Sequence, residues 1–115
     1  MSKILIVDDE EMLADCLKDE FEFLGHEVTV FNDPEVVCKQ PSIPSFDVII
    51  LDIKMPRMNG IELYEIIKPK SKAKFVFLSA ISDMMSQESA LKKADLILEK
   101  PFSLEDIKKI VDLAK

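Results

Sequence analysis

The chain alternates short apolar runs with segments whose apolar residues recur at helical spacing. Five runs have the length of β-strands, and they lie at 4–7, 27–31, 48–51, 75–78 and 96–98. Three of the four residues in 48–51 are β-branched, which predicts a strand buried on both faces. The run at 27–31 alternates polar and apolar residues and predicts an edge strand with one wetter face.

A helical pattern follows each of these runs. The first pattern has an apolar stripe wide enough to face a sheet, and it stops at Gly25, a residue that commonly follows a helix end. The members of the stripe are Leu13, Cys16, Leu17, Glu20, Phe21 and Leu24. The third pattern begins at Ile61 and is ended by Pro69.

The last two helical patterns differ in strength. The fourth, around Met84 and Met85, is weakly amphipathic, so we expect a poorly anchored helix there. The fifth begins with Ser103 and Asp106, which have the spacing of a capping box.

Strands and helices that alternate with short connections predict βαβ units and a parallel sheet covered on both faces. We therefore expect a single α/β domain over 1–115, a doubly wound (βα)5 fold of the flavodoxin type. For a five-stranded sheet the order 2-1-3-4-5 is common. It places the carboxyl ends of the first and third strands side by side.

Composition supports a globular domain and narrows its partners. The 115 residues are 48% hydrophobic and 32% charged, unlike a disordered chain. The net charge of -7 argues against direct binding to nucleic acid. No apolar run approaches the ~20 residues of a membrane span, and 1–3 lead straight into a strand run. We expect no signal peptide, no membrane insertion and a cytoplasmic location.

The two cysteines have no metal-binding or redox spacing. Cys16 and Cys38 both lie in helical patterns, far apart in the sequence. We expect two buried or half-buried free thiols in a reducing compartment.

Carboxylates stand at two strand ends that the predicted order makes neighbours. Asp8 and Asp9 follow the first run, and Asp52 follows the third. Each of these acids, taken alone, is explained by an ordinary structural role as the cap of a helix or a loop. Three carboxylates in one crevice, however, repel each other unless a cation lies among them, and oxygen ligands suit Mg²⁺ or Mn²⁺.

Two further polar residues are expected at the same edge of the sheet as these carboxylates. Ser79 ends the fourth run, and Lys100 follows the fifth. A hydroxyl, an ammonium and a divalent cation together suit a phosphoryl group. A carboxylate that accepts this group becomes an aspartyl phosphate.

In these residues the chain resembles the receiver domains of two-component response regulators, the CheY-like superfamily. The resemblance covers essentially the whole chain, and its four motifs are specific because they occur in order, each at a strand end. CheY is itself a standard example of the strand order given above. The matching segments are Asp8-Asp9, Asp52 with Met55-Pro56 and Asn59-Gly60, Ser79-Ala80, and Lys100-Pro101-Phe102.

The resemblance implies a phosphorylation site with a bound metal ion. Asp52 is the implied phosphoacceptor, and Mg²⁺ or Mn²⁺ is the implied cofactor. Asp8 and Asp9 are the implied metal ligands, the second more often in direct contact. The backbone carbonyl of Lys54 completes the implied metal site.

Two residues are implied to contact the phosphoryl group after its transfer. Ser79 donates a hydrogen bond to it, and Lys100 forms an ion pair with it. The peptide bond between Lys100 and Pro101 is expected to be cis.

The implied function is a phosphoacceptor switch, not an enzyme beyond its own phosphorylation and dephosphorylation. The partners are a sensor histidine kinase or a histidine phosphotransfer protein, and a downstream protein that binds the two states differently. With no segment after Lys115, we expect output through the fourth and fifth helices and the last strand. The alternative is a receiver taken from a longer regulator.

Two other function classes remain open. A Mg²⁺-dependent phosphohydrolase would need a second acid two residues after the nucleophile, where Lys54 stands. An interaction module independent of phosphate is disfavoured by the intact acids and lysine. It is favoured slightly by Ile97, which replaces the family's usual aromatic residue. Because Ile97 replaces the aromatic residue, we expect phosphorylation to reorder the helix around Met84 and Met85 instead.

We predict a slowly hydrolysing aspartyl phosphate. Lys54 and Ile81 occupy family positions that influence phosphoryl loss, and neither side chain suits the orientation of an attacking water. Lys54→Asn combined with Ile81→Glu is therefore expected to shorten the lifetime of the phosphorylated protein, followed by intact mass over time. An unchanged lifetime would show that these positions do not protect the acyl phosphate.

Overall fold

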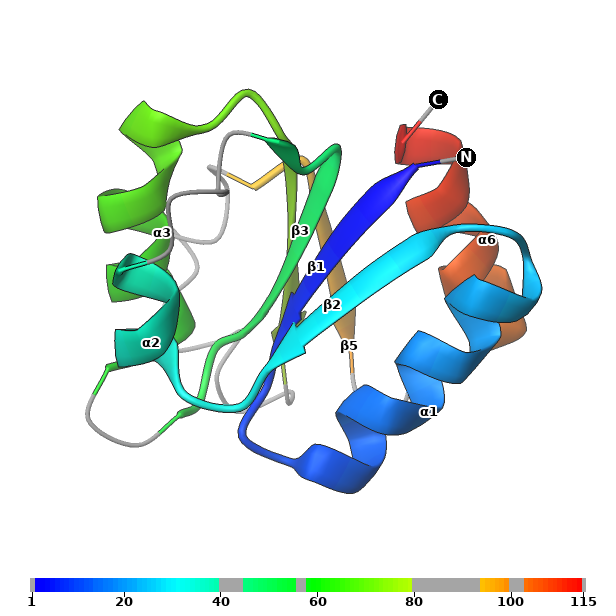
Figure 1. Ribbon diagram of the computed structural model, residues 1–115, viewed down its shortest axis with the longest axis horizontal. Helices are drawn as coiled ribbons and strands as arrows, with labels where there is room; N and C mark the ends of the chain where they lie inside the picture. Colours follow the sequence, from blue (N-terminus) through cyan, green and yellow to red (C-terminus); the bar gives the residue numbers. More distant parts are fainter. Residues whose placement is uncertain (1, 40–44, 56–57, 80–93, 100–102, 115) are drawn as a thin grey trace.

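The computed structural model describes residues 2–39, 45–55, 58–79, 94–99 and 103–114. They form a five-stranded parallel sheet between two layers of helices (Figure 1). The strands are β1 (Lys3–Val7), β2 (Glu27–Phe31), β3 (Val48–Asp52), β4 (Lys74–Ser79) and β5 (Leu96–Glu99). The helices are α1 (Glu11–Phe23), α2 (Pro34–Cys38), α3 (Gly60–Ile67) and α6 (Leu104–Ala114), with a 3-10 turn η2 (Lys68–Lys70) after α3.

The strand order is β2-β1-β3-β4-β5, and every pair of neighbouring strands is parallel. This confirms the predicted order, with β2 at an edge. The register pairs Val7 with Leu51 and Leu51 with Phe77. Asp52, the last residue of β3, therefore lies between the ends of β1 and β4.

Each face of the sheet has its own apolar core. Ile6 and Ile50 pack on the face covered by α1 and α6, whereas Leu5 and Leu51 pack on the face covered by α2 and α3 (Figure 1). Every residue of β3 is buried. A strand buried on both faces has no polar side to alternate with, which explains the continuous apolar run at 48–51.

The buried face of α1 differs from the predicted stripe: Ala14, which was not in the stripe, is buried, and Cys16, Glu20 and Leu24, which were, are exposed. The helix buries Ala14, Leu17 and Phe21, whereas Cys16 is exposed. The expectation of a buried or half-buried Cys16 is therefore wrong, because the helix turns the face through Ala14 toward the sheet. Cys38 is half-buried as predicted, and both thiols are free.

Most of the predicted helix ends are confirmed. Gly25 follows α1 with φ 90°, the left-handed conformation that favours glycine after a helix. At the start of α6, Ser103 N donates to Asp106 Oδ2 (2.9 Å) and Asp106 N donates to Ser103 Oγ (3.3 Å), which is the predicted capping box. The fourth helical pattern, with Met84 and Met85, lies outside the described residues. No described helix has the length and hydrophobicity needed to cross a membrane.

Candidate functional site

Three strand ends bring buried polar side chains together. Among the described residues, the buried polar or charged side chains are Asp8 (0% exposed), Asp52 (3%) and Ser79 (0%). They stand at the carboxyl ends of β1, β3 and β4. Doubly wound sheets bind their ligands at this edge, so the burial of two carboxylates here marks a site rather than a cap.

Hydrogen bonds from the end of β2 fix the backbone of Asp8. Asp8 N donates to Phe31 O (3.1 Å), and Asn32 Nδ2 donates to Asp8 O (2.8 Å). On the side chain, Asp8 Oδ1 accepts from Glu10 N (2.9 Å). Hydrogen bonds therefore hold both the backbone and the carboxylate of Asp8. The sequence analysis did not single out Asn32.

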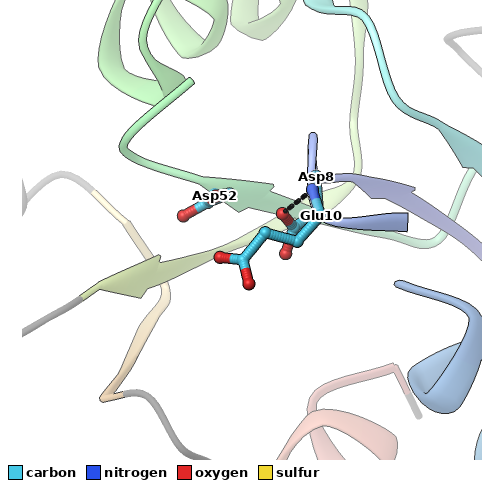
Figure 2. A group of neighbouring side chains, drawn as sticks. All are labelled: Asp8, Glu10 and Asp52. Carbon is cyan, nitrogen blue, oxygen red and sulfur yellow. Dashed lines mark hydrogen bonds between the residues drawn. The ribbon is translucent and has the colours of Figure 1, made fainter. Parts of the chain in front are cut away.

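A third carboxylate completes an acidic cluster. One carboxylate oxygen from each of Asp8, Glu10 and Asp52 lies within 4.8 Å of the other two (Figure 2). Figure 2 shows the Glu10 side chain extending from beside Asp8 toward Asp52. Within the described part of the chain, this group offers three hard oxygen ligands in reach of one ion. The donor set suits a divalent cation such as Mg²⁺, which would also relieve the repulsion among the acids.

The other predicted metal ligands are placed less directly. Asp9 is exposed, and it is not part of the carboxylate group found among the described residues. Lys54 has an exposed side chain two residues after Asp52. Lys100 and its peptide bond to Pro101 lie outside the described residues, so their expected roles stay predictions.

Glu10 was missed because its place depends on how the chain enters α1. It occupies the N-cap position with φ -84° and ψ 95°, which turns its side chain out of the helix. The only signal in the sequence is the acidic run at 8–11. Such a run is also ordinary chemistry for a helix start.

The loop after β3 is tied at both ends. Ile53 N donates to Leu78 O (3.1 Å), and Gly60 N donates to Ile53 O (2.8 Å). Asn59 caps α3 in a capping box with Glu62, because Glu62 N donates to Asn59 Oδ1 (2.8 Å) and Asn59 N donates to Glu62 Oε1 (3.4 Å). These bonds hold the residues on both sides of the loop that follows Asp52.

Gly60 lies directly against the backbone of Asp52. A Cβ on Gly60 would lie 2.9 Å from Asp52 C and 3.0 Å from Ile53 Cα, and closer still to Asp52 O. Gly60 was expected to precede α3 as a turn residue, but it is the first residue of the helix. The absence of a side chain therefore serves the close approach to Asp52.

Replacement of Asn32 tests how Asp8 is held. Asn32→Ala removes the hydrogen bond to Asp8 O, so we expect a loss of about 1–2 kcal/mol in the free energy of unfolding. We also expect a smaller stabilisation by added Mg²⁺, measured by urea denaturation with and without the ion. Asp33→Ala removes the N-cap of α2 at similar cost but leaves Asp8 untouched. Equal Mg²⁺ effects in both variants would contradict the role given to Asn32.

Comparison with known proteins places the chain among signalling proteins. Residues 4–112 match the family model of the response regulator receiver domain. The response regulator ArlR of Staphylococcus saprophyticus is 31% identical over 108 residues, covering 93% of this chain and 49% of that protein. The transcriptional regulatory protein CrdR of Helicobacter pylori is 31% identical over 109 residues, covering 91% and 51%. The chain thus spans about half the length of the curated relatives it matches.

Solved structures agree with the family match. The response regulator TrrA of Thermotoga maritima, in complex with Mg²⁺-BeF, has a TM-score of 0.86 and 33% identity, with 100% of both chains covered. A receiver domain of Clostridium thermocellum has a TM-score of 0.88 and 27% identity, covering 99% of this chain and 94% of that one. The family model matches nearly the whole chain, its acids lie where such a fold binds ligands, and the chain therefore belongs to the receiver domains of two-component response regulators.

Proposed function

We propose that residues 1–115 form one receiver domain in which Asp52 accepts a phosphoryl group from a phosphohistidine. The donor is a sensor histidine kinase or a histidine phosphotransfer protein, and a downstream protein distinguishes the two states. The observation that carries this proposal is the burial of Asp52 beside Asp8, at the end of the central strand. Two carboxylates buried side by side are costly to desolvate and repel each other, and such costly arrangements are concentrated at functional sites.

The proposed transfer is a direct displacement at phosphorus. A carboxylate oxygen of Asp52 forms a bond to phosphorus while the bond from phosphorus to the imidazole nitrogen breaks. The electron pair of the broken bond stays on the imidazole, which leaves neutral because its other nitrogen carries a proton. A carboxylate needs no general base for this step.

Other residues of the site receive supporting roles in the proposal. Asp8, Asp9, Asp52 and the carbonyl of Lys54 would hold Mg²⁺, or Mn²⁺ in its place. The bound ion would supply positive charge between the carboxylates and the phosphoryl oxygens.

After the transfer, two side chains would contact the phosphoryl group. Ser79 would donate a hydrogen bond to it from the end of β4, where its hydroxyl is buried at the same edge as Asp52. Lys100 would form an ion pair with it. The domain would then act through altered protein contacts and not by turnover of a small substrate. The cytoplasmic location expected from the sequence stays a prediction.

Phosphorylation by a small-molecule donor tests the proposal. The protein is incubated with acetyl phosphate, with and without Mg²⁺, and its intact mass is measured. We expect one added phosphoryl group per chain, formed only with Mg²⁺. Beryllofluoride is tested in parallel as a stable mimic that does not hydrolyse. If no phosphoryl group is added and beryllofluoride does not bind, the domain is an interaction module independent of phosphate.

A further inference from the structure

We propose that three lysines around the start of β4 form a docking row for an acidic, extended segment of a partner protein. The lysine row consists of Lys70, Lys72 and Lys74, at the amino-terminal edge of the sheet. In Figure 1 this segment crosses from the top of α3 to β4, at the opposite end of the molecule from the start of α1. Lys74 is in register with Val48, the first residue of β3, whereas Asp52 is the last, about 13 Å further along the strand. The row is therefore a surface separate from the proposed phosphorylation site.

Positive charge is concentrated in this segment of an otherwise acidic chain. Residues 68–74, KPKSKAK, hold four of the 15 basic residues of a chain whose net charge is -7. All four lysines are exposed, and none of them forms an ion pair with another residue that the structure describes. Neighbouring ammonium groups without carboxylate partners repel one another and favour the binding of an external anion.

The segment presents the lysine row on one side. Ser71 has an extended backbone, with φ -138° and ψ 145°, and β4 continues the segment from Lys74. Burial alternates along it, because the lysines of the row are exposed whereas Ala73 and Phe75 are buried and Ser71 is half-buried. Alternate residues of an extended chain project to the same side, about 6.6 Å apart. The three lysines therefore project with the same repeat as every second residue of an extended peptide.

Local contacts hold the backbone beneath the lysine row. Ser71 N donates to Lys68 O (3.3 Å), and Ala73 N donates to Ser71 Oγ (3.0 Å). The ammonium group of Lys68 lies 5.2 Å from the centre of the Phe75 ring, so this fourth lysine packs against the segment itself. A backbone that is already fixed lowers the entropy lost when a partner binds.

Acids on both sides of Lys74 determine which anion fits. Asp47 precedes β3 and Asp95 precedes β5, the two strands beside β4, and both acids are exposed. Their carboxylates accept hydrogen bonds from backbone N–H groups, Asp47 Oδ2 from Lys3 N and Asp95 Oδ2 from Phe75 N (both 2.8 Å). A nucleic acid or an anionic membrane would face these acids together with the row. A single peptide strand follows the row without covering either acid, so alternating Asp or Glu residues complement it best.

Two peptides of identical composition test the match in spacing. In one peptide glutamate alternates with threonine, and in the other the same residues form two blocks. The alternating peptide can direct all its glutamates to one side of an extended chain, whereas the block peptide can direct only half of them. By fluorescence anisotropy at low salt, we expect the alternating peptide to bind about threefold more tightly or better, and added NaCl to weaken its binding. Equal affinities for the two peptides, or binding that is insensitive to salt, would overturn the proposal.

Charge-matched variants separate the lysine row from net charge. The row variant combines Lys70→Gln, Lys72→Gln and Lys74→Gln. The control variant makes the same change at three exposed lysines elsewhere, as Lys39→Gln, Lys108→Gln and Lys109→Gln. We expect the row variant to bind the alternating peptide about tenfold more weakly and the control variant to lose less than about twofold, since each exposed ion pair contributes a few-fold in affinity. Arginine at the three row positions is expected to keep the affinity. Equal losses in the row and control variants would mean that net charge alone attracts the peptide, and the proposal would be wrong.

Other polyanions and the phosphorylation assay complete the test. A single-stranded oligonucleotide of the same length and vesicles that contain phosphatidylserine are titrated with the same variants. If either binds the lysine row more tightly than the alternating peptide does, the partner is not an acidic peptide and the proposal fails. The row variant is expected to keep the urea stability of the unchanged protein and to accept a phosphoryl group from acetyl phosphate as readily. Loss of folding stability in that variant would mean that the lysines have a structural role, which also overturns the proposal.

Discussion

Asp52→Asn is expected to abolish phosphorylation by acetyl phosphate, with no added mass even at long incubation with Mg²⁺. An amide has no anionic oxygen to attack phosphorus, and it is a poorer ligand for a hard cation. The metal-free variant is expected to be at least as stable to urea as the unchanged protein. The substitution removes a buried charge, 3% exposed, from a cluster of acids within 4.8 Å.

A matched substitution separates this effect from loss of charge in general. Asp19→Asn makes the same chemical change at an exposed position of α1. We expect full phosphorylation of that variant. If Asp52→Asn accepts a phosphoryl group as readily as Asp19→Asn does, the phosphoacceptor lies elsewhere and the role given to the end of β3 is wrong.

Gly60→Ala is expected to lower the free energy of unfolding by about 3 kcal/mol, a large fraction of the stability of a small domain. The added Cβ would lie 2.9 Å from Asp52 C and nearer still to Asp52 O, so backbone must move. Because that backbone carries Asp52, the proposed phosphoacceptor, we also expect slower phosphorylation by acetyl phosphate. Urea denaturation and the rate of mass gain measure the two effects.

The chain's other glycine is the control for this substitution. Gly25 has φ 90°, and nothing lies within 4 Å of a Cβ added there. Gly25→Ala is therefore expected to cost only the conformational penalty, about 1 kcal/mol, without any change in the phosphorylation rate. Equal losses of stability in both variants would mean that close approach is not what requires Gly60.

The sheet could be predicted from the sequence because two independent patterns agree on it. Apolar runs at 48–51 and 75–78 place the central strands, and the helical patterns between runs require parallel connections. The observed order β2-β1-β3-β4-β5 then brings Asp8 and Asp52 to one edge. Placement of these two acids needed only the order of the strands and not the detail of any loop.

Features that depend on angles within the chain were not predictable. The face that α1 turns to the sheet passes through Ala14, and this rotation leaves Cys16 exposed. The direction of the Glu10 side chain follows from its N-cap backbone angles, φ -84° and ψ 95°. An acidic run at 8–11 gives no means of choosing which of its members turns back toward β3.

Asn32 and Gly60 show a third kind of limit. Each contacts the backbone of an acid that is distant in the sequence or across a loop, Asp8 in one case and Asp52 in the other. Their residue types are ordinary for turns, so the sequence alone gives a sufficient local reason for both. Their part in holding the site appears only once the strand ends are placed together.

Trapping the acyl phosphate tests the central claim most directly. The protein is phosphorylated by a phosphohistidine donor or by phosphoramidate in the presence of Mg²⁺ and then reduced with sodium borohydride, which converts an aspartyl phosphate to homoserine. Peptide mass spectrometry then locates the reduced residue. We expect homoserine at position 52 and nowhere else, and only when Mg²⁺ is present. Homoserine at another aspartate, or a stable phosphoryl group on a hydroxyl residue, would contradict Asp52 as the phosphoacceptor.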